Sequence, residues 1–383
     1  MKIAAIFRSF HFIGGSERLF LKTINLLEEK GHIVDVFIFG DARGVNQISN
    51  ITPIIVPYKK PYLTFLAGDY IFRRQYKILS HMINNNNYDL VFFGHIQNLF
   101  PLLGLIRHHC ACYFHEPERN LYDKHIRSYL SFSEKLLYSC KKTIKYPLEK
   151  KWINKADCII ANSKYTQNNI KRIYNKDSVV IYPAVDISKF TTIKKKNNNI
   201  IFIPGRIDFV KNQILALDAL LRINPSYEIK IYITGYSINP ISYKHEIFKR
   251  IKKLKEKGWD VQVLQYISDQ QYIKILQNSL VTLYPARYEP FGMVPIESMA
   301  CGTPVIALKE GGPMESIIHN KTGFLSSNQI KEYKKYIQYC IDNPQDAIIM
   351  GKNGRKLVER KFTWDIFINK LQKVFASVLC VEI

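Results

Sequence analysis

The sequence predicts an α/β protein built from two doubly wound domains. At 383 residues the chain is too long for one ordinary hydrophobic core and fits two domains. Short apolar runs recur along it, separated by segments long enough for helices, as in a parallel sheet covered by helices. A polar, basic stretch at residues 191–199 interrupts this pattern near the middle. We therefore expect domains at residues 1–190 and 191–361, followed by a C-terminal helix at residues 362–383.

The first domain begins with a βαβ unit. Strands are expected at residues 1–7 and 33–39, and Gly14 and Gly15 lead into a helix that ends near Lys30. Adjacent glycines let a substrate approach the backbone closely, whereas the G-x-G-x-x-G spacing that would indicate NAD binding does not occur here. Later strands of this domain are expected at residues 90–93, 112–114, 158–161 and 179–182.

The second domain repeats the alternation of strands and helices. Thr363 is expected to cap an amphipathic helix that follows this domain and ends near Leu379. Two doubly wound domains that face each other would place a ligand cleft between the carboxyl ends of their strands. The strands of the second domain are expected at residues 200–203, 228–234, 261–264, 280–284 and 304–308.

Two carboxylates, Glu289 and Glu297, flank the expected start of a helix in the second domain. A short apolar strand precedes them, and helix formers follow. The backbone N–H groups near Phe291, Gly292 and Met293 would point at an anion, helped by the helix dipole, and a diphosphate fits that description. Glu297 could then accept hydrogen bonds from ribose hydroxyls, while Glu289 could reach the hydroxyls of an attached sugar. The alternative is that both glutamates are solvated surface charges.

Residues 288–307 closely resemble the donor-site signature of the GT-B glycosyltransferases of family 4. Their sequence, YEPFGMVPIESMACGTPVIA, is followed by Gly311 and Gly312 and then by a Gly-Phe-Leu run at residues 323–325. The resemblance implies two Rossmann-like domains that face a central cleft, the first binding the acceptor and the second the nucleotide sugar. It also implies that the C-terminal helix crosses back to the first domain. The activity that it implies is retaining transfer of a hexose from a nucleoside diphosphate sugar.

Two cations follow the first strand of the second domain. Arg206 and Lys211 belong to the segment GRIDFVKN, which begins at Gly205 and resembles the G-R-x4-K element of the family. Arginine can bind two phosphate oxygens as a fork and lysine supplies a point charge, so together they would bind the donor and neutralise the charge on a departing diphosphate. The alternative is that both are exposed cations after a strand.

The resemblance assigns roles in the first domain as well. His115 follows a strand at a place where family members carry a histidine near the reacting sugar, and the alternative is a structural histidine. Gly14 and Gly15 match the Gly-Gly loop that faces the donor phosphate and sugar. The acidic residue after the histidine is Glu116, where Asp is common, so the part of Glu116 in acceptor activation stays open.

No metal ion or cofactor is expected. His108, His109, Cys110, Cys112 and His115 lie close together in the sequence, but alternation along a strand sends neighbouring side chains to opposite faces and no second ligand cluster closes a zinc site. The chain also contains no D-x-D sequence, so positive side chains and helix dipoles would replace Mg²⁺. The nucleoside diphosphate sugar would be a substrate and not a cofactor.

Three further stretches, at residues 111–117, 152–166 and 181–183, are similar to lipid-linked oligosaccharide mannosyltransferases of the family. This similarity implies GDP-mannose as the first candidate donor. It also implies a lipid-linked or glycan acceptor in the synthesis of cell-surface polysaccharide or glycoconjugates. The family resemblance favours front-face transfer, in which the leaving phosphate helps to deprotonate the acceptor. The alternatives are a sugar-nucleotide epimerase of the same fold and a non-catalytic sugar-nucleotide-binding subunit.

The net charge of +23 and the pI near 9.5 indicate an anionic partner or a compositional bias. Nucleic acid is not expected, because no zinc-finger spacing, RNA-binding aromatic signature or long basic helix occurs. Residues 141–155 combine lysines with Tyr146, Leu148, Trp152 and Ile153, which is typical of a bilayer interface. The alternative there is a solvated helix whose apolar residues face the core.

The cysteines and the lack of long apolar runs favour a cytoplasmic protein. The chain has seven cysteines, an odd number without the spacing of a disulfide framework, and no secretory signal. No stretch reaches the roughly 18 apolar residues that would span a membrane. Together with the basic stretch, this predicts a cytoplasmic chain that is peripheral at the inner face of the cell membrane.

Overall fold

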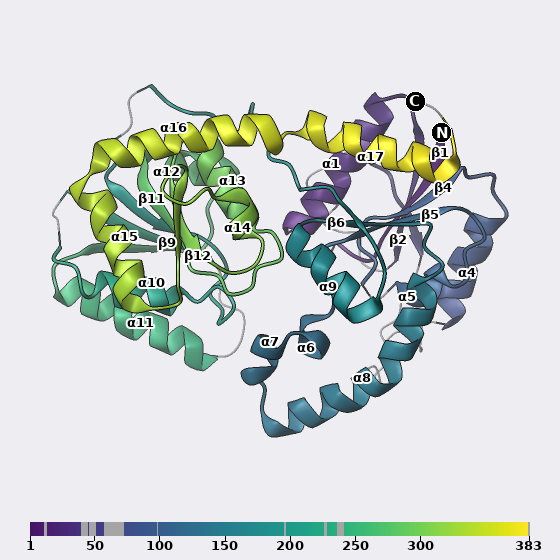
Figure 1. Cartoon of the computed structure of the whole chain (residues 1–383), viewed down its shortest axis with the longest axis horizontal. Helices are drawn as coiled ribbons and strands as arrows, with labels where there is room; N and C mark the ends of the chain where they lie inside the picture. The colour runs from purple at the N-terminus through teal and green to yellow at the C-terminus, as the bar shows by residue number, and fades with distance from the viewer. Residues whose placement is uncertain are drawn as a thin grey trace. The chain divides into compact units, whose positions relative to one another are not determined.

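The computed structural model describes residues 1–10, 14–39, 45, 51–56, 73–97, 99–194, 197–225, 228–235 and 241–381 (Figure 1). The chain divides into two compact units, unit 1 with Met1–Pro183 and Phe367–Ile383, and unit 2 with Ala184–Ile366. These divisions lie a few residues from the expected 190/191 and 361/362. Residues 184–190 belong with unit 2 because Arg355, in α16 (Pro344–Lys361), donates hydrogen bonds to the backbone oxygens of Ile187 and Phe190.

Unit 1 is built on a parallel sheet whose described strands follow the order β3-β2-β1-β4-β5-β6-β7. The order reverses beside β1, with β2 on one side and β4 on the other. Open α/β sheets bind ligands at such a switch point, outside the carboxyl ends of the strands. The strands are β1 (Lys2–Phe7), β2 (Ile33–Phe39), β3 (Ile54–Val56), β4 (Leu90–Phe93), β5 (Cys110–Phe114), β6 (Cys158–Ala161) and β7 (Val179–Val180).

The described helices of unit 1 include one from the far end of the chain. They are α1 (Gly15–Glu29), α4 (Arg73–Asn84), α5 (Phe100–Leu103), α6 (Arg119–Tyr122), α7 (Lys124–Ser128), α8 (Phe132–Ile153), α9 (Lys164–Tyr174) and α17 (Trp364–Leu379). Helix α17 packs on the sheet of unit 1, where the Phe375 ring lies 5.3 Å from that of Phe92 and the Phe367 ring lies 6.0 Å from that of Tyr113 (Figure 1). The amphipathic helix expected after Thr363 therefore buries its apolar face on unit 1.

Unit 2 repeats the doubly wound design with the strand order β10-β9-β8-β11-β12-β13, again parallel throughout. Its switch point lies between β8 and β11. The strands are β8 (Ile200–Ile203), β9 (Lys230–Thr234), β10 (Asp260–Leu264), β11 (Ser279–Tyr284), β12 (Val305–Leu308) and β13 (Gly323–Ser326). Besides α16, the described helices are α10 (Gln213–Leu220), α11 (Ile241–Glu256), α12 (Asp269–Asn278), α13 (Met293–Ala300), α14 (Pro313–Ser316) and α15 (Ile330–Asp342).

The predicted α/β class with two doubly wound sheets is confirmed. Every residue of β4, β5, β8 and β11 is buried, because helices cover both faces of a parallel sheet. Such strands appear in the sequence as continuous apolar runs. Among the helices of the described ranges, none is long and apolar enough to cross a bilayer.

The strand predictions were wrong in a few places for physical reasons. Strand β3 is short and exposes two of its three residues, and β13 begins with a glycine and ends with a serine, so neither has a strong apolar run. Strand β7 covers only Val179–Val180 instead of residues 179–182. The carbonyl of Ile181, beyond that strand, accepts a hydrogen bond from the Tyr113 hydroxyl at 2.9 Å.

Three of the four apolar side chains expected at a bilayer interface in residues 141–155 face the core of unit 1 from helix α8. Tyr146 and Trp152 pack against the core of unit 1, and Ile153 is fully buried. Glu149, on the same side, is 4 % exposed and accepts hydrogen bonds from buried tyrosine hydroxyls. These apolar side chains face the protein, which is the alternative that the sequence left open.

Candidate functional site

Most of the predicted donor-site residues follow two neighbouring strands of unit 2. Strands β8 and β11 are paired at the switch point of the sheet, and parallel strands bring their carboxyl ends to the same edge. Arg206 and Lys211 follow β8, while Glu289 lies between β11 and α13. Gly14, Gly15 and His115 lie in unit 1 instead.

Lys211 and Glu289 form a direct ion pair within this edge. The Nζ atom of Lys211 donates to Oε2 of Glu289 at 2.8 Å and to the hydroxyl of Tyr284 at 3.1 Å. The two charged side chains are only 15 % and 17 % exposed. The sequence predicted Lys211 and Glu289 separately, 78 positions apart, and did not single out Tyr284, the last residue of β11.

The surroundings of this contact keep Lys211 charged. Burial by itself lowers the pKa of Lys211, but the nearby Glu289 carboxylate and the Tyr284 hydroxyl outweigh it and raise the pKa above its ordinary value. Burial and the Glu289 carboxylate raise the pKa of Tyr284, so its hydroxyl stays protonated at neutral pH. The result is a fixed ammonium between a carboxylate and a neutral phenol, in a place where water screens charge poorly.

Asp208 links the two predicted cations and was not predicted from the sequence. Its Oδ1 accepts the backbone N–H of Lys211 at 2.8 Å, and its Oδ2 lies 3.4 Å from Nε of Arg206. Asp208 is 8 % exposed, whereas half of the Arg206 side chain remains exposed to solvent. Asp208 therefore fixes the loop after β8 and leaves the Arg206 guanidinium at the surface of unit 2.

Glycines allow the loop before α13 to pack closely against its neighbour. Gly312 donates its backbone N–H to the Glu289 carbonyl at 2.7 Å, and a Cβ atom at Gly311 or Gly312 would overlap the backbone of residues 288–291. Gly292, the N-cap residue of α13, has φ of 86°, which side chains rarely allow. The Gly-Gly sequence that follows β12 therefore holds Glu289 in place.

The start of α13 carries the other predicted donor contacts. Met293 is its first residue, and because its N-cap is a glycine, no side chain caps the first turn. Glu297 lies one turn further on, and its Oε2 accepts a hydrogen bond from the Tyr272 hydroxyl of α12 at 2.8 Å. One carboxylate oxygen of Glu297 is thus held by the protein, a constraint that the sequence did not reveal.

Gly14 and Gly15 mark the start of α1 in unit 1. Gly14 is the N-cap residue, and its N–H donates to the Glu17 carboxylate at 2.9 Å in a capping box. In this structure, Glu17 therefore satisfies a backbone group that was expected to face the donor phosphate.

His115 lies beside a second histidine that the sequence analysis did not single out. His95 follows β4 and His115 follows β5, and the two ring centroids are 5.0 Å apart. Nε2 of His115 and Nδ1 of His95 are buried without a hydrogen-bond partner among the residues that the structure describes. Burial lowers the pKa of His115 well below its usual value and that of His95 to about 4. Both imidazoles are therefore neutral at pH 7.

Unit 1 is expected to lose stability as the pH falls from 6.5 towards about 4. The unfolded chain takes up protons on these histidines near pH 6.5, whereas the folded chain takes them up only near pH 4 at His95 and well below pH 6.5 at His115. Linkage then lowers the free energy of unfolding across this window. Thermal unfolding at a series of pH values should show a smaller loss in His95→Gln and His115→Gln than in the wild type.

The exposed His245 in α11 provides the matched control for this prediction. His245→Gln should retain the full acid sensitivity of the wild type. Equal acid sensitivity in all three variants would mean that the His95 and His115 pair is not responsible.

No metal-binding group is found within the described ranges. No three His, Cys, Asp or Glu side chains there come together in a way that could hold an ion. Of the residues considered for zinc, Cys110 and Cys112 are buried in β5, and burial raises the pKa of Cys110 to about 12. Both thiols are therefore protonated at neutral pH.

Among the described residues of unit 2, one hollow adjoins the predicted donor residues. It measures about 210 Å³ and lies at the carboxyl ends of β9 and β10. A Cβ atom on Gly235 would overlap the Gly205 carbonyl next to Arg206, so the hollow and the cation loop are adjacent. This hollow was not predicted from the sequence, although a glycine directly after a strand was a signal. Its lining comprises Ile207, Gly235, Lys244, Phe248, Val263, Gln265 and Tyr266.

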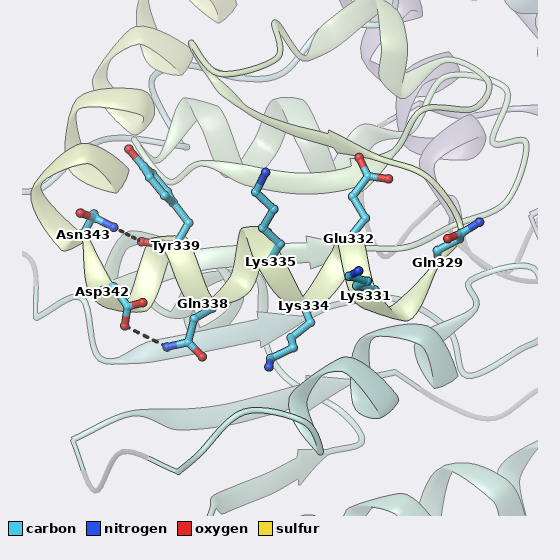
Figure 2. A pocket seen from close by; sticks show the side chains of 9 residues that line it. All are labelled: Gln329, Lys331, Glu332, Lys334, Lys335, Gln338, Tyr339, Asp342 and Asn343. Atoms are coloured by element: carbon cyan, nitrogen blue, oxygen red, sulfur yellow. Dashed lines mark hydrogen bonds between the residues drawn. The ribbon is translucent and has the colours of Figure 1, made fainter.

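The second hollow, about 620 Å³, runs along α15 and its two ends. Figure 2 shows that the side chains drawn there all come from this helix segment, with Gln338 bonded to Asp342 and Asn343 to Tyr339. Neither hollow is lined by a predicted site residue, but Ile207, which lies between Arg206 and Lys211, lines the smaller hollow, and no residue of that loop lines the larger one. The larger hollow is therefore not the one beside the predicted donor-site residues.

Comparison with known proteins identifies the family. The profile described as Glycosyltransferase Family 4 matches residues 13–189, and the profile described as Glycosyl transferases group 1 matches residues 184–357. The mouse α-1,3/1,6-mannosyltransferase ALG2 is 29% identical over 287 residues, which cover 67% of this chain and 69% of that protein. The human ALG2 protein is also 29% identical, over 67% of this chain and 68% of its own length.

Solved structures share the fold. Anabaena HepE in complex with UDP aligns with a TM-score of 0.75 and 20% identity, covering 98% of this chain and 100% of its own. The sucrose-phosphate synthase of Thermosynechococcus elongatus aligns with a TM-score of 0.78 and 19% identity, over 99% of each chain. The two family profiles together match residues 13–357, so the chain belongs to the group 1 and family 4 glycosyltransferases and is a glycosyltransferase with the GT-B fold.

Proposed function

We propose that this enzyme transfers a hexose from a nucleoside diphosphate sugar to an acceptor hydroxyl with retention at the anomeric carbon. The contact between Lys211 and Glu289 beside the start of α13 is the observation that carries the proposal. It puts a largely buried positive charge and a carboxylate side by side, next to a helix start without a side-chain cap. A diphosphate and the sugar attached to it present the complementary groups, which are phosphate oxygens and hydroxyls.

In the proposed reaction, the acceptor oxygen bonds to the anomeric carbon on the face from which the phosphate oxygen departs. The proton of the acceptor hydroxyl passes to a phosphate oxygen of the leaving nucleoside diphosphate. Lys211 and Arg206 neutralise the charge that develops on this diphosphate. Glu289 orients the transferred sugar through its hydroxyls, and His115 is the residue of unit 1 that the family resemblance assigns to the reacting sugar.

The proposed donor is GDP-mannose, because the mouse and human relatives, each 29% identical to this chain, are named α-1,3/1,6-mannosyltransferases. UDP-glucose is the second candidate, because HepE was solved in complex with it. The hollow beside Gly235 and Tyr266 would take the base, since it adjoins the cation loop and carries an aromatic side chain at its edge.

A thermal-shift panel of UDP, GDP, ADP and their sugars tests the donor. A nucleotide at 100 times its dissociation constant stabilises the protein by about 2.7 kcal/mol, enough for a clear shift. Transfer of labelled sugar from the best ligand to candidate acceptors then tests the reaction. Turnover of the donor without any acceptor would contradict the proposal and favour an epimerase. Absence of a shift with every nucleotide would contradict donor binding altogether.

The proposed acceptor is a lipid-linked or glycan hydroxyl in the synthesis of cell-surface polysaccharide or glycoconjugates. The proposed location is the cytoplasm, at the inner face of the membrane. The net charge of +23 supports a position at an anionic surface. Conversion of a lipid-linked substrate, compared with its water-soluble analogue, separates the two acceptor classes.

Sugar transfer should survive an excess of EDTA, because the proposal assigns the neutralising charge to Arg206 and Lys211 and not to a divalent cation. Initial rates with and without the chelator provide the measurement. Activity that disappears with EDTA and returns with Mg²⁺ or Mn²⁺ would show that the reaction depends on a metal.

A further inference from the structure

Helix α8 is apolar on two opposite sides. Its inner side packs on unit 1, where Tyr138, Tyr146 and Trp152 contact the core and Ile153 is fully buried. Its outer side carries Phe132, Leu136 and Ile144, which are 84 %, 59 % and 58 % exposed. The outer side thus leaves three large apolar side chains in water.

These three side chains form one stripe. They are spaced by four and eight residues, which keeps them on one side of a helix that turns every 3.6 residues. Cys140 and Pro147, also exposed, continue the stripe, and at 1.5 Å per residue it runs for about 22 Å from Phe132 to Pro147. Single exposed apolar residues are ordinary on a protein surface, but an aligned set of this length marks an interaction surface.

The charges of α8 indicate which partner fits this stripe. The helix contains six lysines and two glutamates, and one of the glutamates, Glu149, is buried. Lys150 and Lys151 are exposed where the stripe ends. A second copy of the chain would bring lysines against lysines, with +23 on each molecule. An anionic lipid surface accepts both the apolar stripe and the cations.

We propose that this outer side of α8, formed by Phe132, Leu136, Ile144, Lys150 and Lys151, binds the surface of a bilayer that contains anionic lipids. The helix lies in the plane of the interface, with the stripe among the acyl chains and the lysines at the headgroups. Binding at this surface would bring the enzyme to a lipid-linked acceptor, and in that respect it rests on the proposed function. This surface shares Lys150 and Lys151 with the stretch that the sequence indicated but differs in its apolar residues, because Tyr146, Trp152 and Ile153 face the core.

Vesicle sedimentation of the full-length chain tests the surface. It should sediment with vesicles of phosphatidylcholine and phosphatidylglycerol, less so as salt rises, and not with phosphatidylcholine alone. Phe132→Ser with Leu136→Ser should weaken this binding by roughly 10- to 100-fold, since two large side chains no longer leave water. Lys150→Glu with Lys151→Glu should abolish the preference for anionic vesicles.

Matched control variants exist on α16 of unit 2. The exposed fraction of Ile349, 55 %, is similar to the 58 % of Ile144. Ile144→Ser should therefore weaken binding, while Ile349→Ser should not. Lys352→Glu with Lys356→Glu changes the net charge as much as the Lys150 and Lys151 pair does, and both of these lysines are exposed. This control should retain most of the binding. Thermal unfolding of every variant should match the wild type, because all of these positions are at the surface.

Three results would overturn the proposal. The first is vesicle binding by the Phe132 and Leu136 double variant that equals that of the wild type. The second is wild-type binding to phosphatidylcholine alone that equals binding to the anionic vesicles. The third is a dimer of the wild type in sedimentation velocity without lipid that dissociates in the same double variant. The last result would assign the stripe to a second copy of the chain. Vesicle binding is measured without any nucleotide, so the two tests are independent. A negative vesicle result does not affect the thermal-shift test of the donor, and a negative donor result does not affect the vesicle test.

Discussion

Lys211→Ala should lower kcat by about 10²- to 10³-fold, the usual scale for removing one group that stabilises developing charge. The Lys211 ammonium is largely buried, charged and fixed by Glu289 and Tyr284, so it would act on a departing diphosphate without first reorganising. Nucleotide affinity should fall less than turnover does. Steady-state kinetics at saturating donor, together with calorimetry on the free nucleoside diphosphate, measures both effects.

Arg206→Ala is expected to lower kcat within the same range and to leave folding intact, because half of the Arg206 side chain is exposed. Lys211→Ala also leaves the Glu289 carboxylate without its buried partner, so its thermal unfolding must be measured beside its kinetics. Lys211→Arg keeps the charge and should recover part of the rate. If both alanine variants turn over at nearly the wild-type rate with saturating donor, these two cations do not neutralise the leaving group.

Lys211 and Glu289 should also show strong coupling. Because the two side chains touch, the double variant Lys211→Ala with Glu289→Gln should lose less activity than the sum of the two single losses in free energy. Arg206 contacts Asp208, and the comparison pair is Arg206 with Glu289. We expect the losses in free energy to add for Arg206→Ala with Glu289→Gln, but not for Lys211→Ala with Glu289→Gln.

The strands could be predicted from the sequence because parallel strands are buried on both faces. The runs at residues 90–93, 158–161 and 200–203 were each predicted to the residue, since their ends coincide with the ends of apolar runs. The three-residue edge strand β3 has no comparable signal, because two of its residues face solvent. Apolar continuity therefore predicts the centre of a sheet better than its edges.

Contacts across the sheet could not be predicted in the same way. The sequence predicted Lys211 and Glu289 through separate motifs, and their ion pair exists only because β8 and β11 are neighbours in the sheet. Tyr272 and Tyr284 carry no local signal, since a tyrosine in an apolar run is usually a core residue. The prediction of which side of helix α8 faces the bilayer was wrong for another reason. The sequence of a helix that is apolar on two sides does not show which side faces the core.

Glu297→Gln and Glu289→Gln should impair different kinetic parameters. Glu297, if it binds only the ribose, contacts a part of the donor that hardly changes during the reaction. Its amide variant should therefore mainly raise the donor KM, as expected when ground-state and transition-state binding are lost together. Tyr272→Phe removes the hydroxyl that holds one Glu297 oxygen and should raise the donor KM by a smaller factor.

Glu289→Gln should lower kcat while leaving affinity for the free nucleoside diphosphate unchanged or slightly improved. In the wild type, the Glu289 carboxylate holds the Lys211 ammonium at 2.8 Å and so competes with a diphosphate for the same charge. A neutral amide removes that competition, but it also removes the negative charge that the proposed function places near the anomeric carbon, where positive charge develops in the transition state. Calorimetry with the nucleotide and steady-state kinetics on both variants separate these effects. If Glu289→Gln loses nucleotide affinity while Glu297→Gln loses only kcat, the roles of the two carboxylates are the reverse of those proposed, and the sugar would then lie nearer to α13 than to the loop before it.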